Sequence, residues 1–506
     1  FFHPDPTVKR QSGFLFPQFN NNQNLGFSTQ IPYYKVIDHD KDLTISPRVF
    51  ANNNLFAQAE YRQAFKNSNL VTDFSYNKKD KSNSHFFSTL IGDFEDSFYE
   101  MKIQTVSNDN YLKKYQVKSP IIDSYSSLNS QISYEKFTDE YKFSTSINVF
   151  EDLSKIDSDR YEYLFPSYDF IKEKSFEGGT FNNVSLKSSG NYRKFDTNVD
   201  EADIINDLVL SSDNYGQFNN LENEINILLR NVNTYGDYSS VYKEDTDHKL
   251  IGSFLVNLKY PLIKENLNGK KFLTPIASLR YSPNKGSNLK NEKTLVTFED
   301  LLQIDRIKSN TIETGASATL GFEHKYQTKS NIDKLKFGAA INIRNKIDDD
   351  LPRSSSLGEK TSDIIGYSGI NITENLAINY NFSLEQNLSG SNYSLLSANY
   401  VGDKLQTTFE YMEKSNFVGD ESYLTNFTKL NIDKKNSLGF ETNKNLDKDL
   451  TNYYNLIYSY QNDCLEASLV YNKQFYTDQD VNSGKNIFFK ISFKPFGSIN
   501  SPNLNE

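Results

Sequence analysis

The chain has 506 residues but no tryptophan, only two methionines and a single cysteine. It also lacks any apolar run of the roughly 18 residues that a membrane-crossing helix needs. Together with a mean hydropathy of −0.64, this excludes a helical membrane protein. One cysteine can form no disulfide within the chain, and it excludes cysteine-based structural metal sites. The net charge of −10 argues against nucleic acid as a partner.

Aromatic residues are abundant despite the missing tryptophan, because 38 phenylalanines and 33 tyrosines make up 14% of the chain. This content is too high for a disordered protein, in spite of the many asparagine, serine and lysine residues. The chain opens at Phe1 with neither a charged nor an apolar leader segment. We interpret it as a mature protein or as a piece of a longer one.

Apolar residues follow a period of two along most of the chain. Segments 254–260, 376–385, 465–472 and 487–494 show this alternation most clearly. It gives a β-strand one apolar and one polar face. We count about 25 candidate strands of about 10 to 14 residues, and an even number, about 24 or 26, is typical of a bacterial single-chain barrel. Helical spacing is nearly absent, and we expect a short helix at most over 298–307.

A soluble sandwich or a β-solenoid would alternate in the same way, with its apolar side as a dry core. Three features favour a membrane barrel instead. Tyrosines such as Tyr33, Tyr260 and Tyr471 stand towards strand ends, as the aromatic girdles of a barrel require. The opposite face is polar, as a wet lumen requires. The last strand carries Phe489 and Phe493 near the C-terminus, where outer-membrane barrels commonly have their assembly signal.

No chemical constellation stands out among the titratable residues. The five histidines lie far apart in sequence, and none forms a metal-spaced pair. The run from Asp38 to Asp42 begins like a calcium-binding loop, but Leu43 and Val49 stand where glycine and glutamate are needed. There is no nucleophile elbow and no glycine-rich phosphate loop. The sequence therefore predicts neither an enzyme nor a metal or cofactor site.

Two prolines stand inside the first two candidate strands, Pro32 and Pro47. Proline lacks the N–H that a strand ladder needs, so interior strands normally exclude it. One interpretation is that the strands simply start or end at these prolines. The other is a weakened pair of strands at which the barrel can open.

Short segments along the whole chain carry a family resemblance. They are FHPDPTVKR (2–10), SGFLFP (12–17), IPYY (31–34), DLTISPR (42–48), EYRQ (60–63), YLFP (163–166), LTPI (273–276), DLL (300–302) followed by DR (305–306), LP (351–352), SDIIG (362–366) and DCL (463–465). In this order and spacing they resemble the LptD family of lipopolysaccharide-assembly outer-membrane proteins. Each segment alone is weakly diagnostic, whereas their ordered combination is specific.

The resemblance implies an all-β fold, a transmembrane antiparallel β-barrel of about 26 strands. It divides the chain into three parts. Residues 1–23 would enter the barrel from a missing N-terminal periplasmic domain, residues 24–497 would form the barrel, and residues 498–506 would be a C-terminal tail. It also implies the outer membrane of a Gram-negative bacterium as the location.

The resemblance further implies transport and no catalysis. Members of the family accept lipopolysaccharide from periplasmic bridge proteins through the N-terminal domain, enclose an LptE-like lipoprotein plug, and release the lipid through a lateral seam between the first and last strands. Pro32 and Pro47 match the family's seam prolines. We therefore expect a lateral gate between the strand containing Pro32, taken as the first, and the strand at 486–493, which contains Phe489 and Phe493.

Two departures from the family pattern matter. The N-terminal domain that receives the lipid is missing from this sequence. Where many members have two adjacent cysteines, Asp463 here precedes a single Cys464. At most one disulfide to the absent domain is therefore expected, from Cys464.

Two other functions compete with lipopolysaccharide insertion. A passive porin or receptor barrel for solutes would need neither seam prolines nor a cysteine awaiting a partner domain. A soluble β-rich adhesin would stay soluble without detergent.

Overall fold

The computed structural model describes most of the chain apart from its ends and short internal stretches. The described residues are 10–15, 17–22, 25–51, 54–77, 83–115, 117–122, 124–155, 157–178, 181–213, 220–283, 287–307, 310–447, 449–462, 465–474, 485–493 and 497–500. Nearly all regular structure in them is β-strand. Within these ranges no helix has both the length and the apolar character needed to cross a membrane.

The strands form one antiparallel sheet of 30 segments in which neighbours along the chain pair. Their bounds are β1 (Gly13–Phe14), β2 (Gln18–Asn22), β3 (Gly26–Gln30), β4 (Tyr33–Asp38), β5 (Lys41–Phe50), β6 (Leu55–Ala64), β7 (Ser68–Asn77), β8 (Asn83–Asp93), β9 (Ser97–Val106), β10 (Ser127–Phe137), β11 (Tyr141–Asp152), β12 (Tyr161–Ser175), β13 (Asn183–Phe195), β14 (Val199–Asp213), β15 (Glu222–Asp237), β16 (Asp247–Lys259), β17 (Leu262–Asn266), β18 (Gly269–Ser282), β19 (Gly315–Thr328), β20 (Asp333–Arg344), β21 (Ile364–Asn371), β22 (Leu376–Leu384), β23 (Ser391–Val401), β24 (Leu405–Lys414), β25 (Glu421–Asn431), β26 (Asn436–Asn445), β27 (Leu450–Gln461), β28 (Leu465–Gln474), β29 (Lys485–Phe493) and β30 (Gly497–Asn500). The helical turns are α1 (Tyr111–Tyr115), η1 (Asp157–Arg160), η2 (Asp300–Leu302), η3 (Arg353–Ser355) and η4 (Asn416–Val418).

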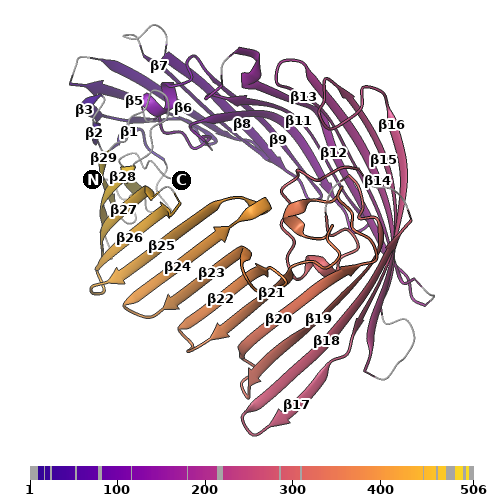
Figure 1. Ribbon diagram of the computed structural model, residues 1–506. Coiled ribbons are helices and arrows are strands. Elements are labelled where there is room, and N and C mark those ends of the chain that lie inside the picture. The colour runs from indigo at the N-terminus through magenta and orange to yellow at the C-terminus, as the bar shows by residue number, and fades with distance from the viewer. Residues whose placement is uncertain are drawn as a thin grey trace.

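Three pairs of these segments are each one strand interrupted at a proline. β3 and β4, on either side of Pro32, both pair with β5, and β16 and β17, on either side of Pro261, both pair with β18. β1 and β2 flank Pro17 and pair with β4 and β3. If each interrupted pair is counted as one strand and the four-residue β30 is left out, the 30 segments form 26 strands. This confirms the predicted barrel, whose strands close into a ring in Figure 1.

The two faces of the sheet are reversed relative to a soluble protein. In β9, Ile103 is 53% exposed, whereas the neighbouring Gln104 is 6% exposed. In β7, Phe74 is exposed while Asp73 and Ser75 are buried. Apolar side chains that point outward and polar ones that point inward fit a wall between lipid and a wet lumen.

Connections at the two ends of the barrel differ in length. At one end they are tight turns such as 65–67, 94–96 and 138–140. At the other end, three long connections follow β9, β18 and β20, at 107–126, 283–314 and 345–363. Bacterial barrels place their short turns in the periplasm and their long loops outside. The long connections therefore mark the extracellular end.

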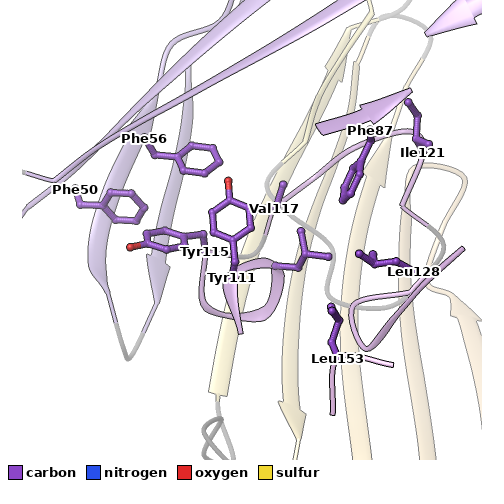
Figure 2. Packing of buried hydrophobic residues seen from close by; sticks show 10 residues of the cluster. Phe50, Phe56, Phe87, Tyr111, Tyr115, Val117, Ile121, Leu128 and Leu153 are labelled. Atoms are coloured by element: carbon purple, nitrogen blue, oxygen red, sulfur yellow. The ribbon is translucent and has the colours of Figure 1, made fainter. Parts of the chain in front are cut away.

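These long connections fold onto the inner wall. Figure 1 shows the segments after β18 and β20 inside the ring of strands. Their buried apolar side chains pack with Ile276, Ala340 and Ile365 of the wall. The connection after β9, with α1, forms a second cluster against β5, β6 and β8 (Figure 2). Its members are Phe50, Phe56, Phe87, Tyr111, Leu112, Tyr115, Val117, Ile121, Leu128 and Leu153.

Three expectations about local structure differ from the observed fold. Segment 298–307, all of which is described, contains the 3-10 turn η2 in place of a helix, because Phe298 and Leu301 are fixed by packing on the wall. The sheet begins at Gly13, before the expected boundary at residue 24, because β1 and β2 pair with β4 and β3. At the other end, β30 pairs with β29, so part of the expected tail belongs to the sheet.

Candidate functional site

Prolines occupy the first three strands of the barrel in succession, as Pro17, Pro32 and Pro47. The backbone N–H of Leu15 donates to the carbonyl of Pro32 over 2.8 Å, and that of Ile31 donates to the carbonyl of Pro47 over 3.1 Å. In an antiparallel ladder, residues paired in this way exchange two hydrogen bonds, and proline cannot donate the second. The ladders between strands one and two and between strands two and three therefore each lack one bond.

The position of Pro32 corrects one detail of the sequence analysis. The strand that contains Pro32 is the second strand, and the first is the interrupted pair β1 and β2. The pattern of this first strand was missed because Pro17 divides it into segments of two and five residues. Pro47 lies within β5, the third strand, opposite Ala57 of β6.

The first and last strands lie beside each other. Cα atoms of β2 and β29 approach to within 8 Å, on the side of the ring where both chain ends lie (Figure 1). Among the described residues, β2 pairs with β3, and β29 pairs with β28 and β30, and there is no ladder between β2 and β29. The sheet thus has a seam here. β30 occupies the edge of β29 from Lys490 to Phe493.

The predicted gate residues Phe489 and Phe493 belong to β29, where they face Leu469 and Leu465 in the register with β28. Both statements concern the pairing of the backbones. Cys464, the expected disulfide residue, lies outside the described residues, so its pairing stays a prediction.

A buried carboxylate joins the first strands at their periplasmic end. Asp42 is 3% exposed. It accepts hydrogen bonds from Arg62 Nε at 2.8 Å, from Tyr34 Oη at 3.1 Å and from Arg10 Nη1 at 3.2 Å. These contacts connect the segment before β1 with β4, β5 and β6, so the strands with missing ladder bonds are held together beside the turn at 39–40.

A second charged network fixes the connection 283–314 to the inner wall. Glu313 binds Arg306 at 2.5 and 2.6 Å and also binds Arg344, and it lies 3.9 Å from Arg280. Burial alone would raise the pKa of Glu313, but Arg306, Arg280 and Arg344 lower it to about 2. Arg280 also donates to the carbonyls of Gln303 and Ile304. The connection is therefore attached through charge and through its own backbone.

A polar cavity of about 790 Å³ opens on the inner wall between β12 and β15. Arg193, Asp203, Asp207, Arg230 and Asp305 are among the residues that line it. Charges of both signs on a concave surface can solvate a hydrophilic cargo such as a sugar chain. The cavity lies on the face that the alternation predicts to be wet.

The fold brings together a Ser-His-Asp set that sequence spacing alone did not suggest. Ser75 Oγ lies 2.6 Å from His85 Nδ1, and His85 Nε2 lies 3.5 Å from Asp73 Oδ2. The pairing of β7 with β8 places Ser75 opposite His85. All three residues are buried, and Tyr111 of α1 contacts Ser75. This arrangement gives a substrate no access, so we interpret the set as a polar anchor for α1.

The run that begins like a calcium loop is a turn in the structure. Asp38, His39 and Asp40 bring their ligand atoms within 4.8 Å of one another, with Asp38 and His39 exposed. The turn resembles a polar hairpin tip more than a chelating site.

Comparison with known proteins gives the family. The model of the family described as "LptD: LPS transport system D" matches residues 68–432. The chain belongs to the LptD family. Membership places it in the outer membrane of a Gram-negative bacterium.

Relatives of this LptD-family chain match it over limited segments. The LPS-assembly protein LptD of Shewanella oneidensis is 39% identical over 66 residues, which are 12% of this chain and 9% of that protein. The LPS-assembly protein LptD of Pseudoalteromonas atlantica is 29% identical over 113 residues, which are 21% of this chain and 15% of that protein. The matched parts thus span less than a sixth of either relative.

Solved structures similar to the chain include two outer-membrane receptors. The alcaligin receptor FauA of Bordetella pertussis has a TM-score of 0.33 and 9% identity, and the match covers 96% of this chain and 76% of FauA. The ferric-catecholate import receptor Fiu of E. coli, in its closed form, has a TM-score of 0.33 and 8% identity, covering 97% and 82% of the two chains.

Proposed function

We propose that the chain is the barrel of a lipopolysaccharide-assembly protein and inserts lipopolysaccharide into the outer leaflet through the seam between β2 and β29. Family membership supports the cargo. The observation that carries the lateral route is the row of prolines on the first three strands, next to two end strands without a ladder between them. The chain would act as a transporter and not as an enzyme.

The chemistry of the cargo agrees with this route. Lipopolysaccharide has a charged sugar head, which a polar lumen can solvate, and acyl tails, which must avoid water. The tails can leave only through the wall. Parting a ladder within lipid costs several kcal/mol for each unsatisfied group. At the seam itself the described residues of β2 and β29 form no ladder. The bonds missing at Pro32 and Pro47 weaken the two neighbouring ladders, so that the first strands can move away from β29 more easily.

The proposed partners follow from the family. They are periplasmic bridge proteins that deliver lipid through an N-terminal domain, an LptE-like lipoprotein in the lumen, and a cysteine of the N-terminal domain that pairs with Cys464. A passive porin or receptor is the weaker candidate, because such a pore gains nothing from missing ladder bonds beside its seam.

The test locks the seam in living cells. Depletion of the protein should reduce the lipopolysaccharide that reaches the cell surface. A cysteine pair with one residue in β2 and one in β29 should stop delivery when oxidised, and a reductant should restore it. The matched control is Thr72→Cys with Ser88→Cys, at paired positions of β7 and β8, which should leave delivery unchanged. Delivery by the locked barrel would show that the lateral route is wrong.

A further inference from the structure

Arg48, in the third strand from the seam, is a buried cation to which no carboxylate of the described residues is paired. It follows Pro47 in β5 and is 5% exposed. Its Nε donates to Ser28 Oγ at 2.9 Å and its Nη1 donates to the carbonyl of Tyr115 at 2.8 Å. Its guanidinium carbon lies 4.7 Å from the ring centre of Phe50. The remaining nitrogen, Nη2, is buried and has no hydrogen-bond partner among the residues that the structure describes.

The other deeply buried arginines in the described part of the chain are compensated. Each of them has a carboxylate oxygen within 4.0 Å, whereas no described carboxylate lies that close to Arg48. They are Arg230, Arg280, Arg306 and Arg344. A buried charge without a partner costs several kcal/mol. Among the described residues, Arg48 therefore has a positive charge that no carboxylate balances and an Nη2 donor that no acceptor occupies. An anion could use both.

The groups that contact Arg48 are neutral, and one of them, the carbonyl of Tyr115, belongs to a segment that covers the inner wall. The segment 111–122, which contains α1, lies over the inner faces of β5 and β6, with Tyr115 beside Phe50 and Phe56 in Figure 2. Side chains of the wall hold this cover by its carbonyls. Besides Arg48, Gln58 donates to the carbonyl of Lys118 at 2.5 Å.

We propose that Arg48 is a phosphate-binding residue of the inner wall and that a phosphate-class anion takes it from the Tyr115 carbonyl, which releases the cover 111–122 from the strands beside the seam. A phosphate is ionised and presents several acceptor oxygens to the planar fork of a guanidinium, whereas the Tyr115 carbonyl is a single neutral acceptor. An incoming phosphate therefore outcompetes Tyr115 and can also use Nη2. The inference rests on the proposed function, because phosphorylated lipid is the cargo that would bring this anion to the seam.

The test measures amide hydrogen exchange of residues 111–122 in the full-length protein purified in detergent. The probes are phosphorylated lipopolysaccharide, the same lipid with its phosphates removed, and inorganic phosphate. Phosphorylated lipid should accelerate exchange about tenfold, which corresponds to about 1.4 kcal/mol. An equal effect of inorganic phosphate identifies any free anion as the ligand, and an effect of the phosphorylated lipid alone identifies the lipid-borne group.

Substitutions separate charge from packing. Arg48→Gln keeps amide donors for the cover but has no charge, and it should abolish the acceleration. Arg48→Lys should retain part of it, which keeps the test decisive if the glutamine variant fails to fold. Arg160→Met, an arginine paired with Glu151 in the connection between β11 and β12, is the control and should respond like the original protein.

Three results would overturn the site: acceleration by dephosphorylated lipid, acceleration in Arg48→Gln, or no effect of either anion. A different result would contradict the proposed function without contradicting the anion site. If depletion leaves surface lipopolysaccharide unchanged while inorganic phosphate still acts through Arg48, the transport proposal is wrong and the anion site stands.

Discussion

At the scale of the residue, Pro32 and Pro47 each remove one identified hydrogen bond. The carbonyls that would receive it are those of Leu15 and Ile31, which donate in the opposite direction. Replacing both prolines with alanine should restore two bonds, each worth about 0.5 to 1.5 kcal/mol. We expect a higher midpoint of urea unfolding, together with slower delivery of lipopolysaccharide to the surface.

The chain offers a matched control for this pair. Tyr260 donates to the carbonyl of Pro275 at 3.1 Å, so Pro275 likewise leaves one ladder bond missing. This ladder joins β18 to the interrupted strand formed by β16 and β17, many strands away from the seam. Pro275→Ala should raise stability similarly without slowing delivery. Equal slowing by both replacements would mean that general stiffness, and not the seam, limits transport.

Glu313 is the residue on which the connection 283–314 depends, because it balances Arg306 and Arg344. Glu313→Gln would remove the carboxylate that Arg306 binds and leave Arg344 with Asp348 alone, at a cost of about 3 to 5 kcal/mol, as is typical of a broken buried pair. We expect the connection to leave the wall while the strands stay paired. Limited proteolysis of intact cells should then cut within 283–314 in the variant and not in the original protein.

The carboxylate of Glu313 should also make the attachment of the connection 283–314 depend on pH. Its pKa in the folded protein is lowered to about 2, so the folded state favours the charged form. The stabilisation is fully present above the ordinary pKa of about 4.5 and is lost as the pH falls through about 2. Protection of 283–314 from an acid-active protease should therefore persist at pH 4, and in Glu313→Gln it should be absent at that pH. Loss of protection between pH 5 and 4 would contradict this assignment.

At the scale of the element, the strands were predictable from the alternation of apolar and polar residues along the sequence. The structure of the connections was not predictable, because it depends on residues far away in the chain. The alternation over 254–260 reflects a wall with lipid on one side, and Phe254 is exposed while Leu255 and Asn257 are buried, as expected. The helix α1 has five residues, too few for a helical period in the sequence. Its Tyr111 and Tyr115 are ordered by Phe56, which is more than 50 residues away in the chain.

The same limit applies to the candidate site. Pro32 and Pro47 could be found from the sequence because proline breaks a ladder wherever it occurs. Arg48 could not, because its importance lies in the absence of a nearby carboxylate, and that depends on the packing of Tyr115 and Phe50. The pairing of Ser75 with His85 likewise depends on the register of β7 and β8.

At the scale of the whole molecule, the reversed faces predict how the protein behaves in solution. Exposed residues such as Ile103, Phe74 and Leu279 need lipid or detergent. We expect circular dichroism dominated by β-structure in detergent and a gel mobility that changes on heating, as the barrel unfolds. A monomer that stays soluble without detergent would contradict the membrane barrel.

The short strand β30 makes the seam different in the two leaflets. β29 runs from the extracellular end towards the periplasmic end, and β30 occupies its edge from Lys490 to Phe493. The part of this edge that remains for β2 is therefore the part beside the outer leaflet. On the proposed route, an acyl chain entering the wall in its periplasmic half would meet a filled edge. One entering nearer the outer leaflet would meet β2 and β29, between whose described residues there is no ladder. The edge of β29 is therefore filled in the periplasmic half of the wall and open in the outer half, which is the depth at which lipid would settle on the proposed route.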